Sequence, residues 1–260
     1  MNSFSWKIGR VVGIDLFLHP SFLLLPAWGL MVGGTDYVLM IAAVFACVVL
    51  HELGHALMAR AFGISTRDIT LYPMGGVARL ESMPKAPGTE LLIALAGPLV
   101  NVALAGGLAL ILGLSGEVGS LGGFLYLQEF LSSLLVINLL LAAFNMVPAF
   151  PMDGGRVLRA LLSGPLGRFR ATEIAVTIGR AMAILFGIYA LMTFSPMQAL
   201  LAAFVYFAAG AELAQVRYEE RDRRFGSSDE GIWTAPRGYQ WVDRGNGLWQ
   251  LAPIHVDSRS

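Results

Sequence analysis

The sequence predicts an all-α polytopic membrane protein with about six transmembrane helices and a small membrane-associated β-hairpin or sheet. Hydrophobic residues occupy 56% of its 260 positions and charged residues only 14%, a composition far from that of soluble proteins. The apolar residues gather in stretches close to the roughly 20 residues that cross a bilayer as a helix. The net charge is zero, so the charge gives no indication of a nucleic-acid partner. The expected surroundings of the chain are therefore the lipid bilayer.

Six apolar stretches are candidate transmembrane helices. Their approximate ranges are residues 17–33, 37–59, 89–113, 124–147, 174–194 and 196–215. The first stretch is short and contains Pro26, and only a break at residues 194–196 separates the last two, so five spans would also fit. The chain is thus expected to divide into a transmembrane core at residues 1–215 and a polar cytoplasmic tail at residues 216–260.

The positive charges give these spans an orientation. With six spans, the short loops on one side of the membrane contain no Lys or Arg, and all 18 positive residues fall on the other side. Loops rich in Lys and Arg stay in the cytoplasm. Both termini are therefore expected to be cytoplasmic.

The segment between the second and third spans does not follow a helical pattern. From residue 62 to residue 88, the run FGISTRDITLYPMGGVARLESMPKAPG alternates apolar and polar residues in short pieces around Gly75 and Gly76. This alternation is typical of strands, and the glycines are typical of a turn between them. We expect a β-hairpin or small sheet within this segment, at residues 64–81.

Two histidines and a glutamate end the second span, in the order His51-Glu52-Leu53-Gly54-His55. Residues i and i+4 share one face of a helix, so both imidazoles can hold one metal ion with Glu52 beside it. Zinc makes water nucleophilic near neutral pH, and a carboxylate that is not a ligand can take the proton of that water. Such groups are costly in an apolar span without partners. The pattern therefore predicts a hydrolytic zinc site.

A catalytic zinc keeps three protein ligands and one open position, so a third ligand must come from elsewhere in the chain. The best candidate is Asp153, which follows two prolines in FNMVPAFPMDGGRVLRALL. Prolines leave non-helical backbone, which a membrane tolerates beside a cavity. His55 lies five residues before Arg60, and Asp153 lies just before Arg156, so both are expected near the cytoplasmic edge. The alternative for Asp153 is a solvated turn or a helix N-cap.

Together these motifs resemble the site-2 protease family, whose members are intramembrane zinc metalloproteases that cleave substrates within or beside their transmembrane helices. The resemblance covers most of the first 215 residues and rests on HELGH at 51–55, AGPLVN at 96–101 and NMVPAFPMDGG at 145–155. Met152 stands where the family usually has leucine. We expect neither the PDZ domain nor the paired nucleotide-sensing domains of some relatives, because no loop or tail is long enough for them.

The resemblance implies a complete set of roles. His51, His55 and Asp153 would hold one Zn²⁺ per chain, and Glu52 would be the general base and acid that activates the zinc-bound water. The substrates would be single-span membrane proteins or signal-peptide remnants. The protein would lie in the bacterial inner membrane, with its active site near the cytoplasmic face.

Three further polar residues have two possible roles each. Asn101, in the third span, would contact the substrate or the developing oxyanion, or else form a hydrogen bond between helices. Asn145 would share that contact, or else satisfy carbonyl groups freed by a following proline. His19 would touch the substrate or the water path, or else lie at the membrane interface.

Functions of other classes are possible in principle. A metal transporter or metal sensor would also use histidines and an aspartate inside a membrane, but it needs no glutamate beside three ligands. The polar groups here also gather at one face of the membrane instead of crossing it. An inactive relative that binds helices without cutting them would not need all four chemical residues. The sequence therefore favours the protease.

Overall fold

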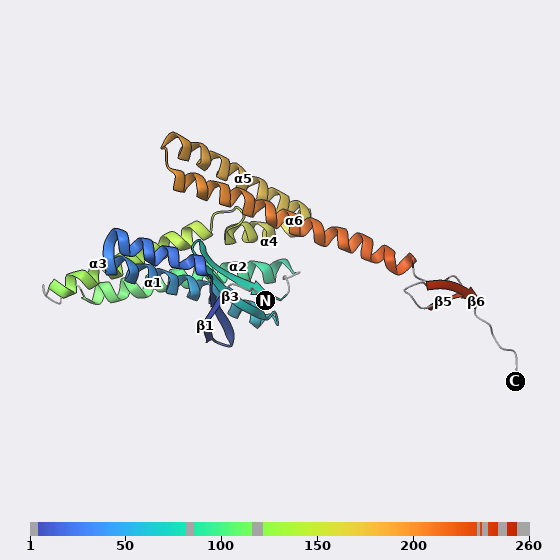
Figure 1. Cartoon of the computed structure of the whole chain (residues 1–260), viewed down its shortest axis with the longest axis horizontal. Coiled ribbons are helices and arrows are strands. Elements are labelled where there is room, and N and C mark those ends of the chain that lie inside the picture. Colours follow the sequence, from blue (N-terminus) through green and yellow to red (C-terminus); the bar gives the residue numbers. More distant parts are fainter. Residues whose placement is uncertain are drawn as a thin grey trace. The chain divides into compact units, whose positions relative to one another are not determined.

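The structure, a computed structural model, describes residues 5–81, 86–115, 122–232, 235, 239–243 and 249–253. The chain forms two compact units, Met1–Glu212 and Leu213–Ser260. The elements, labelled in Figure 1, are β1 (Trp6–Val11), β2 (Ile14–Leu18), the 3-10 helix η1 (Pro20–Leu23), α1 (Leu24–Ala61), β3 (Thr66–Tyr72), β4 (Gly75–Leu80), α2 (Pro87–Ser115), α3 (Gly122–Asn145), α4 (Asp153–Leu166), α5 (Arg168–Met192), α6 (Pro196–Ile232), β5 (Tyr239–Asp243) and β6 (Trp249–Pro253).

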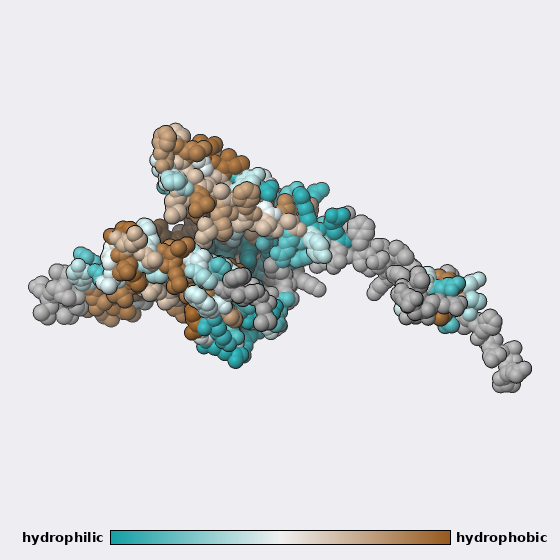
Figure 2. Space-filling view, viewed as in Figure 1, coloured by the Kyte–Doolittle hydropathy of each residue, from teal (hydrophilic) through white to brown (hydrophobic). Residues whose placement is uncertain are grey.

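Five of the described helices, α1, α2, α3, α5 and α6, contain stretches long and apolar enough to cross a membrane. Their outward surfaces carry large apolar side chains: Met31 is 87% exposed and Met192 is 76% exposed. Figure 2 shows apolar surface over the helices and hydrophilic surface over the sheet. Apolar surface of this extent is unfavourable in water but suits lipid. The prediction of a mostly helical membrane fold with a small sheet is confirmed.

Helix α1 joins the first two predicted spans through a kink. The kink lies at Gly34, where φ is 68° and ψ is −154°. The limb before the kink, residues 24–33, is only about 15 Å long at 1.5 Å per residue, about half the thickness of the hydrocarbon core. Residues 17 and 18, predicted to open the first span, end β2 instead. The described part of the chain therefore offers five candidate spans where about six were expected.

The sheet has four strands in the order β1-β2-β3-β4. The predicted hairpin is present as the antiparallel pair β3 and β4. It is extended by β2, which runs parallel to β3, and by β1, which is antiparallel to β2. The sequence did not indicate β1 and β2 as strands. Since β4 pairs only with β3 among the described strands, β4 is an edge strand.

An apolar core fixes this sheet against α1. Ile14, Leu16 and Ile69 of the sheet pack with Leu53 and Ala56 of α1, and all five are buried. Leu53 lies inside the HELGH motif and Ala56 directly follows it. The packing therefore places the sheet beside the helix turns that carry the predicted metal ligands.

The remaining helices complete the first unit. Helix α2 packs against α1, α3 and α4, and α4 packs against α5. Residues 146–152 form the irregular segment between α3 and α4, so the break predicted from the prolines is present. In the other unit, α6 continues past the predicted span end at residue 215 to Ile232, and β5 pairs with β6 in an antiparallel hairpin.

Candidate metal centre

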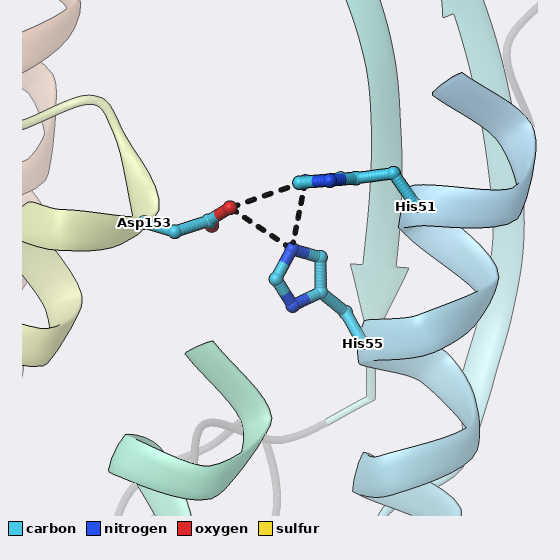
Figure 3. A group of neighbouring side chains, drawn as sticks. All are labelled: His51, His55 and Asp153. Carbon is cyan, nitrogen blue, oxygen red and sulfur yellow. Dashed lines mark hydrogen bonds and ion pairs between the residues drawn. The ribbon is translucent and has the colours of Figure 1, made fainter. Parts of the chain in front are cut away.

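Three predicted ligands meet at one point between α1 and α4. His51 and His55 lie one turn apart on α1 and are buried, and Asp153 is the first residue of α4. Figure 3 shows their side chains pointing toward one another. The Nε2 atoms of the two histidines lie 3.1 Å from each other, and each lies 3.1 Å from Oδ2 of Asp153. The fold therefore brings together residues that are 98 or more positions apart in sequence.

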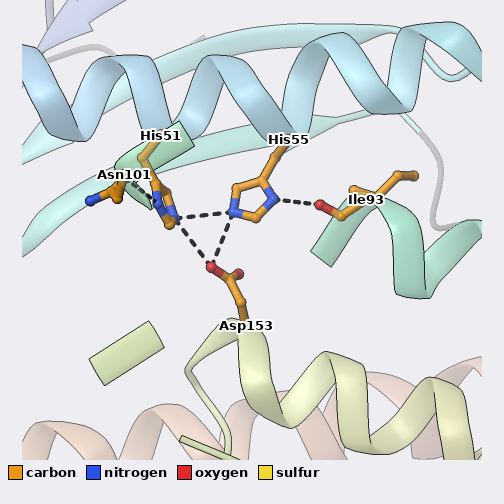
Figure 4. A network of polar contacts seen from close by, with 5 residues as sticks. All are labelled: His51, His55, Ile93, Asn101 and Asp153. Atoms are coloured by element: carbon orange, nitrogen blue, oxygen red, sulfur yellow. Dashed lines mark hydrogen bonds and ion pairs between the residues drawn. The ribbon is translucent and has the colours of Figure 1, made fainter. Parts of the chain in front are cut away.

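Helix α2 provides a hydrogen-bond partner for the nitrogen of each imidazole that faces away from Asp153 (Figure 4). Nδ1 of His55 lies 2.7 Å from the backbone carbonyl oxygen of Ile93, and Nδ1 of His51 lies 3.0 Å from Oδ1 of Asn101. Since a carbonyl oxygen only accepts hydrogen bonds, each Nδ1 donates and carries the proton of a neutral imidazole. Both Nε2 atoms then turn lone pairs toward the carboxylate of Asp153. Three electron-pair donors that face one another are an arrangement that a cation stabilises.

The spacing of the three atoms fits zinc. In a tetrahedral site with zinc–ligand distances near 2.0–2.1 Å, neighbouring ligand atoms lie about 3.3 Å apart; here they are 3.1 Å apart. Asp153 is the acidic member of the set, and its carboxylate would supply a negative charge. Two neutral imidazoles and one carboxylate are an ordinary ligand set for a catalytic zinc, with a fourth position left open.

One face of α2 is shaped around the two histidines. Ile93, Gly97 and Asn101 follow one another at intervals of four residues, so they lie on the same face of the helix. A Cβ atom on Gly97 would overlap Nε2 of His55 and would lie 2.7 Å from Nε2 of His51. Gly97 therefore allows α2 to approach the metal ligands closely. The AGPLVN motif contains Gly97, and the four-residue spacing was the signal from which its position could have been predicted.

Glu52 directly follows the ligand His51 in α1 and lies beside the sheet. Its side chain is half-buried, and a Cβ atom on Gly76 of β4 would lie only 2.8 Å from its Cγ. Edge strand β4 therefore passes directly beside the predicted general base. The structure thus places the predicted acid–base residue next to both the ligand cluster and a strand with one unpaired edge.

The other three residues considered in the sequence, Asn101, Asn145 and His19, differ in their contacts with the metal ligands. Asn101 reaches the site, where its amide oxygen contacts the His51 nitrogen that faces away from the other ligands. Asn145 is the half-buried last residue of α3, and the structure describes no hydrogen bond between it and the three ligands. His19 caps η1, with Nδ1 2.7 Å from Oγ of Ser21 and its ring stacked on Tyr72. The structure describes no hydrogen bond between His19 and the three ligands.

A second buried polar cluster was not predicted. The guanidinium of Arg159 on α4 donates to the carboxylates of Glu90 on α2 and Glu212 on α6. The Arg159 side chain is 1% exposed. Both glutamates lie inside predicted spans, where a carboxylate requires a partner, and that was the signal available in the sequence.

Comparison with known proteins agrees with this geometry. The family model for peptidase family M50 matches residues 39–126 and 122–186, which is more than half of the chain. The chain belongs to peptidase family M50. This is a family of metalloproteases, as the two histidines and the aspartate indicate.

The relatives of this M50 family member include proteins of archaea and bacteria. A zinc metalloprotease of Methanocaldococcus jannaschii is 35% identical over 221 residues, which cover 84% of this chain and 63% of the relative. Stage IV sporulation protein FB of Bacillus subtilis is 26% identical, over 80% of this chain and 67% of the relative. The chain therefore spans about two thirds of the length of these relatives.

A solved structure also matches. The site-2 protease from Methanocaldococcus jannaschii superposes with a TM-score of 0.63 at 34% sequence identity, covering 81% of this chain and 95% of the other. The resemblance to site-2 proteases is thereby confirmed. With its long apolar helices, the chain is an integral membrane protein.

Proposed function

We propose that the protein is an intramembrane zinc metalloprotease, with one zinc per chain, that hydrolyses peptide bonds within or near the transmembrane segments of other membrane proteins. One observation carries this proposal. Two imidazole nitrogens and a carboxylate oxygen face one another at 3.1 Å, with a carbonyl oxygen beside the far nitrogen of each ring. Bound there, zinc would supply the Lewis acidity that makes water nucleophilic near neutral pH and that polarises a peptide carbonyl.

Glu52 is the residue that moves the proton. Its carboxylate takes a proton from the attacking water and later delivers that proton to the nitrogen of the departing amine. The position supports this role, because Glu52 follows the ligand His51 directly and is not a ligand itself. Its contact with Gly76 also places it beside edge strand β4.

Edge strand β4 supports a mode of substrate binding. A transmembrane helix shields its peptide carbonyls through its own hydrogen bonds, so the substrate must unwind before attack. An unwound segment inside a membrane needs new partners for its backbone groups, and an edge strand offers such partners by β-augmentation. We therefore expect the substrate to lie extended along β4, beside Gly76, with its scissile carbonyl close to the metal ligands. The expected substrates are single-span membrane proteins or signal-peptide remnants.

The positive charges support an orientation in the membrane. Because β2 pairs with β3, the segments before and after α1 lie on the same side of the membrane, as they do in the six-span arrangement, where all 18 Lys and Arg residues fall on one side. Lys and Arg favour the cytoplasmic side, so both termini would be cytoplasmic, and the resemblance to bacterial site-2 proteases supports the bacterial inner membrane. The metal ligands then lie near the cytoplasmic face, and water arrives from that side.

Asn101 would act on this chemistry through His51, since its oxygen contacts that ring.

Reconstitution tests the proposed function. The full chain is placed in vesicles with a fluorescently labelled single-span substrate, and cleavage is followed with and without a zinc chelator. We expect cleavage that the chelator abolishes and added zinc restores. Glu52→Gln should keep its zinc and lose activity by a factor of about 10² to 10⁴, the usual contribution of general acid–base catalysis.

Two results would contradict the proposal. Full proteolysis by zinc-loaded Glu52→Gln would remove Glu52 from the mechanism. Zinc uptake into the vesicles without any cleavage of the labelled substrate would instead identify a transporter.

A further inference from the structure

A second buried amide lies on the same side of α1 as the Asn101 amide. Asn101 on α2 and Asn138 on α3 are both fully buried. The Asn101 oxygen lies 3.0 Å from Nδ1 of His51, while Nδ2 of Asn138 donates to Sγ of Cys47 at 3.4 Å. Cys47 and His51 are four residues apart on α1, so they lie on one face about 6 Å apart along the axis. The two amides therefore contact successive turns of the metal-binding helix.

Helix packing keeps these two asparagines near each other. Helices α2 and α3 pack against each other, and both pack against α1. The residues of α1 that the two amides contact, His51 and Cys47, are one turn apart. A separation of about one helix turn is a distance that one water molecule can bridge.

Each amide has one group left over, and the two groups are complementary. Nδ2 of Asn101 and Oδ1 of Asn138 are both buried, and neither has a hydrogen-bond partner among the described residues. The orientations of both amides are fixed: Asn101 accepts from His51, and Asn138 donates to the Leu134 carbonyl at 2.8 Å. What remains is a donor on Asn101 and an acceptor on Asn138. An unpaired buried amide group costs about 1–3 kcal/mol, so the pairing of these two is favourable.

We propose that Asn138 is a positioning residue for the metal ligand His51. Nδ2 of Asn101 donates to one ordered water, which in turn donates to Oδ1 of Asn138, so that a chain of hydrogen bonds runs from His51 through Asn101 to α3. This chain holds the Asn101 oxygen against Nδ1 of His51. It thereby fixes the proton on Nδ1 and keeps the Nε2 lone pair directed at the metal.

The inference rests on the proposed function only in requiring that His51 binds zinc. Partners that orient a metal-bound histidine typically contribute 10- to 100-fold to metal affinity. We therefore expect Asn138→Leu to weaken zinc binding by about that factor, although Asn138 touches none of the three ligands. Zinc affinity is measured by competition with a chelator on the purified full chain in detergent, and the ligand geometry is followed in the visible spectrum of the Co²⁺-substituted protein.

A double-mutant cycle separates a chain from two independent contacts. Asn101→Leu breaks the direct contact with His51, and Asn138→Leu acts only through Asn101. The double variant should therefore bind zinc as weakly as Asn101→Leu alone. Additive losses of affinity would overturn the proposal, because they would show that Asn138 does not act through Asn101.

Matched variants exclude a merely structural role. Asn138→Asp, protonated in this apolar site, keeps both a donor for Leu134 and an acceptor for Asn101, so its zinc affinity and Co²⁺ spectrum should match those of the unsubstituted protein. Asn138→Thr can still bond the Leu134 carbonyl but is too short to reach Asn101, so it should lose affinity as the leucine variant does. If the leucine variant does not fold, these two carry the test, and equal affinities for them would contradict the proposal.

A further control concerns the other contact of Asn138. Cys47→Ala removes the sulfur that Asn138 touches without removing the Asn138 oxygen, and it should leave zinc affinity unchanged. A loss equal to that of Asn138→Leu would assign the effect to packing against α1 and overturn the proposal. Failure of the unsubstituted protein to bind zinc at all would be a failure of the proposed function instead, and it is distinguished by the same measurement.

Discussion

Two buried clusters of three polar residues lie among the described residues of the first unit, and they differ in how their charges are satisfied. In one, His51, His55 and Asp153 turn three electron-pair donors toward one another. In the other, the guanidinium of Arg159 lies between the carboxylates of Glu90 and Glu212, at 2.7 Å from Nε and 2.9 Å from Nη1 respectively. The Arg159 cluster contains its own cation, whereas the histidine cluster needs one from outside.

This difference separates a site from a structural link. Burial and unusual polarity are common to both clusters, so neither property identifies a function by itself. What distinguishes the metal centre is that its protons are held on the far side of each imidazole, by Ile93 and Asn101. The Arg159 cluster instead joins α2, α4 and α6.

The structural link nevertheless supports the site. Helix α4 carries both Asp153 and Arg159. The Arg159 guanidinium lies 4.9 Å from the centre of the Phe150 ring, and Phe150 belongs to the irregular segment that leads into Asp153. The Arg159 cluster therefore contacts the segment that leads into one of the metal ligands.

The largest effect is expected from removing a ligand. His55→Ala should change zinc content, measured by elemental analysis of the purified protein, from one per chain to none, and proteolysis should be lost with it. The matched control is His19→Ala, which removes a histidine outside the cluster and should retain one zinc. Equal loss of zinc from both variants would contradict the assignment of the cluster.

The next effect is expected from filling the space beside the ligands. In Gly97→Ala, the new methyl group would overlap Nε2 of His55, and displacements near 1 Å at a catalytic site can cost about 10² in rate. We expect zinc affinity and proteolytic rate to fall by about that factor. Gly107→Ala on the same helix has nothing within 4 Å of its new methyl group and should behave as the unsubstituted protein. Normal activity of Gly97→Ala would show that α2 does not approach the ligands this closely.

Arg159→Met should affect stability more than zinc binding. Removing one partner of a buried ion pair typically costs about 3–5 kcal/mol, because the other charges stay buried. We expect that loss in the free energy of unfolding in micelles, with one zinc per folded chain retained. Arg170→Met, at an exposed position, is the control and should change stability little.

A triple variant sharpens this prediction. Replacing Glu90 and Glu212 by leucine in the Arg159→Met protein removes every charge of the cluster, and such replacements are often neutral. Stability should then return toward that of the unsubstituted protein. Persistent destabilisation of the triple variant would show that Arg159 contributes packing and not charge compensation.

The smallest effect is expected at Asn145. Since no described hydrogen bond joins Asn145 to the ligands, Asn145→Ala should change the free energy of zinc binding by less than about 0.5 kcal/mol. Asn101→Ala, which removes a direct partner of His51, should weaken binding at least tenfold. Similar affinities for the two variants would mean that the contact between Asn101 and His51 does not matter.

Sequence reasoning reached the ligands because their chemistry leaves local signals. His51 and His55 share a helix face through their four-residue spacing, and polar residues in an apolar span require an explanation. Asp153 could be placed beside them from the depth of neighbouring arginines, although it is 98 residues from His55. The hairpin at residues 66–80 was also local, since its alternating pattern and glycine turn are contiguous.

The features that sequence reasoning missed depend on contacts between distant segments. Strand β2 exists because residues 15–18 pair in parallel with residues 68–71, and no pattern within residues 6–18 alone separates a strand from the start of a span. The partners of Arg159 are 69 and 53 residues away on other helices. The kink in α1 depends on a single positive φ at Gly34, which a pair of glycines permits but does not require.

The central claim is that two imidazole nitrogens and one carboxylate oxygen hold a zinc ion inside the membrane domain. X-ray absorption at the zinc edge of the purified full chain measures this directly. The account predicts one zinc per chain with nitrogen and oxygen neighbours at about 2.0–2.2 Å, two of them imidazoles, and loss of the metal in His55→Ala. Sulfur neighbours near 2.3 Å, or an unchanged spectrum in His55→Ala, would contradict it.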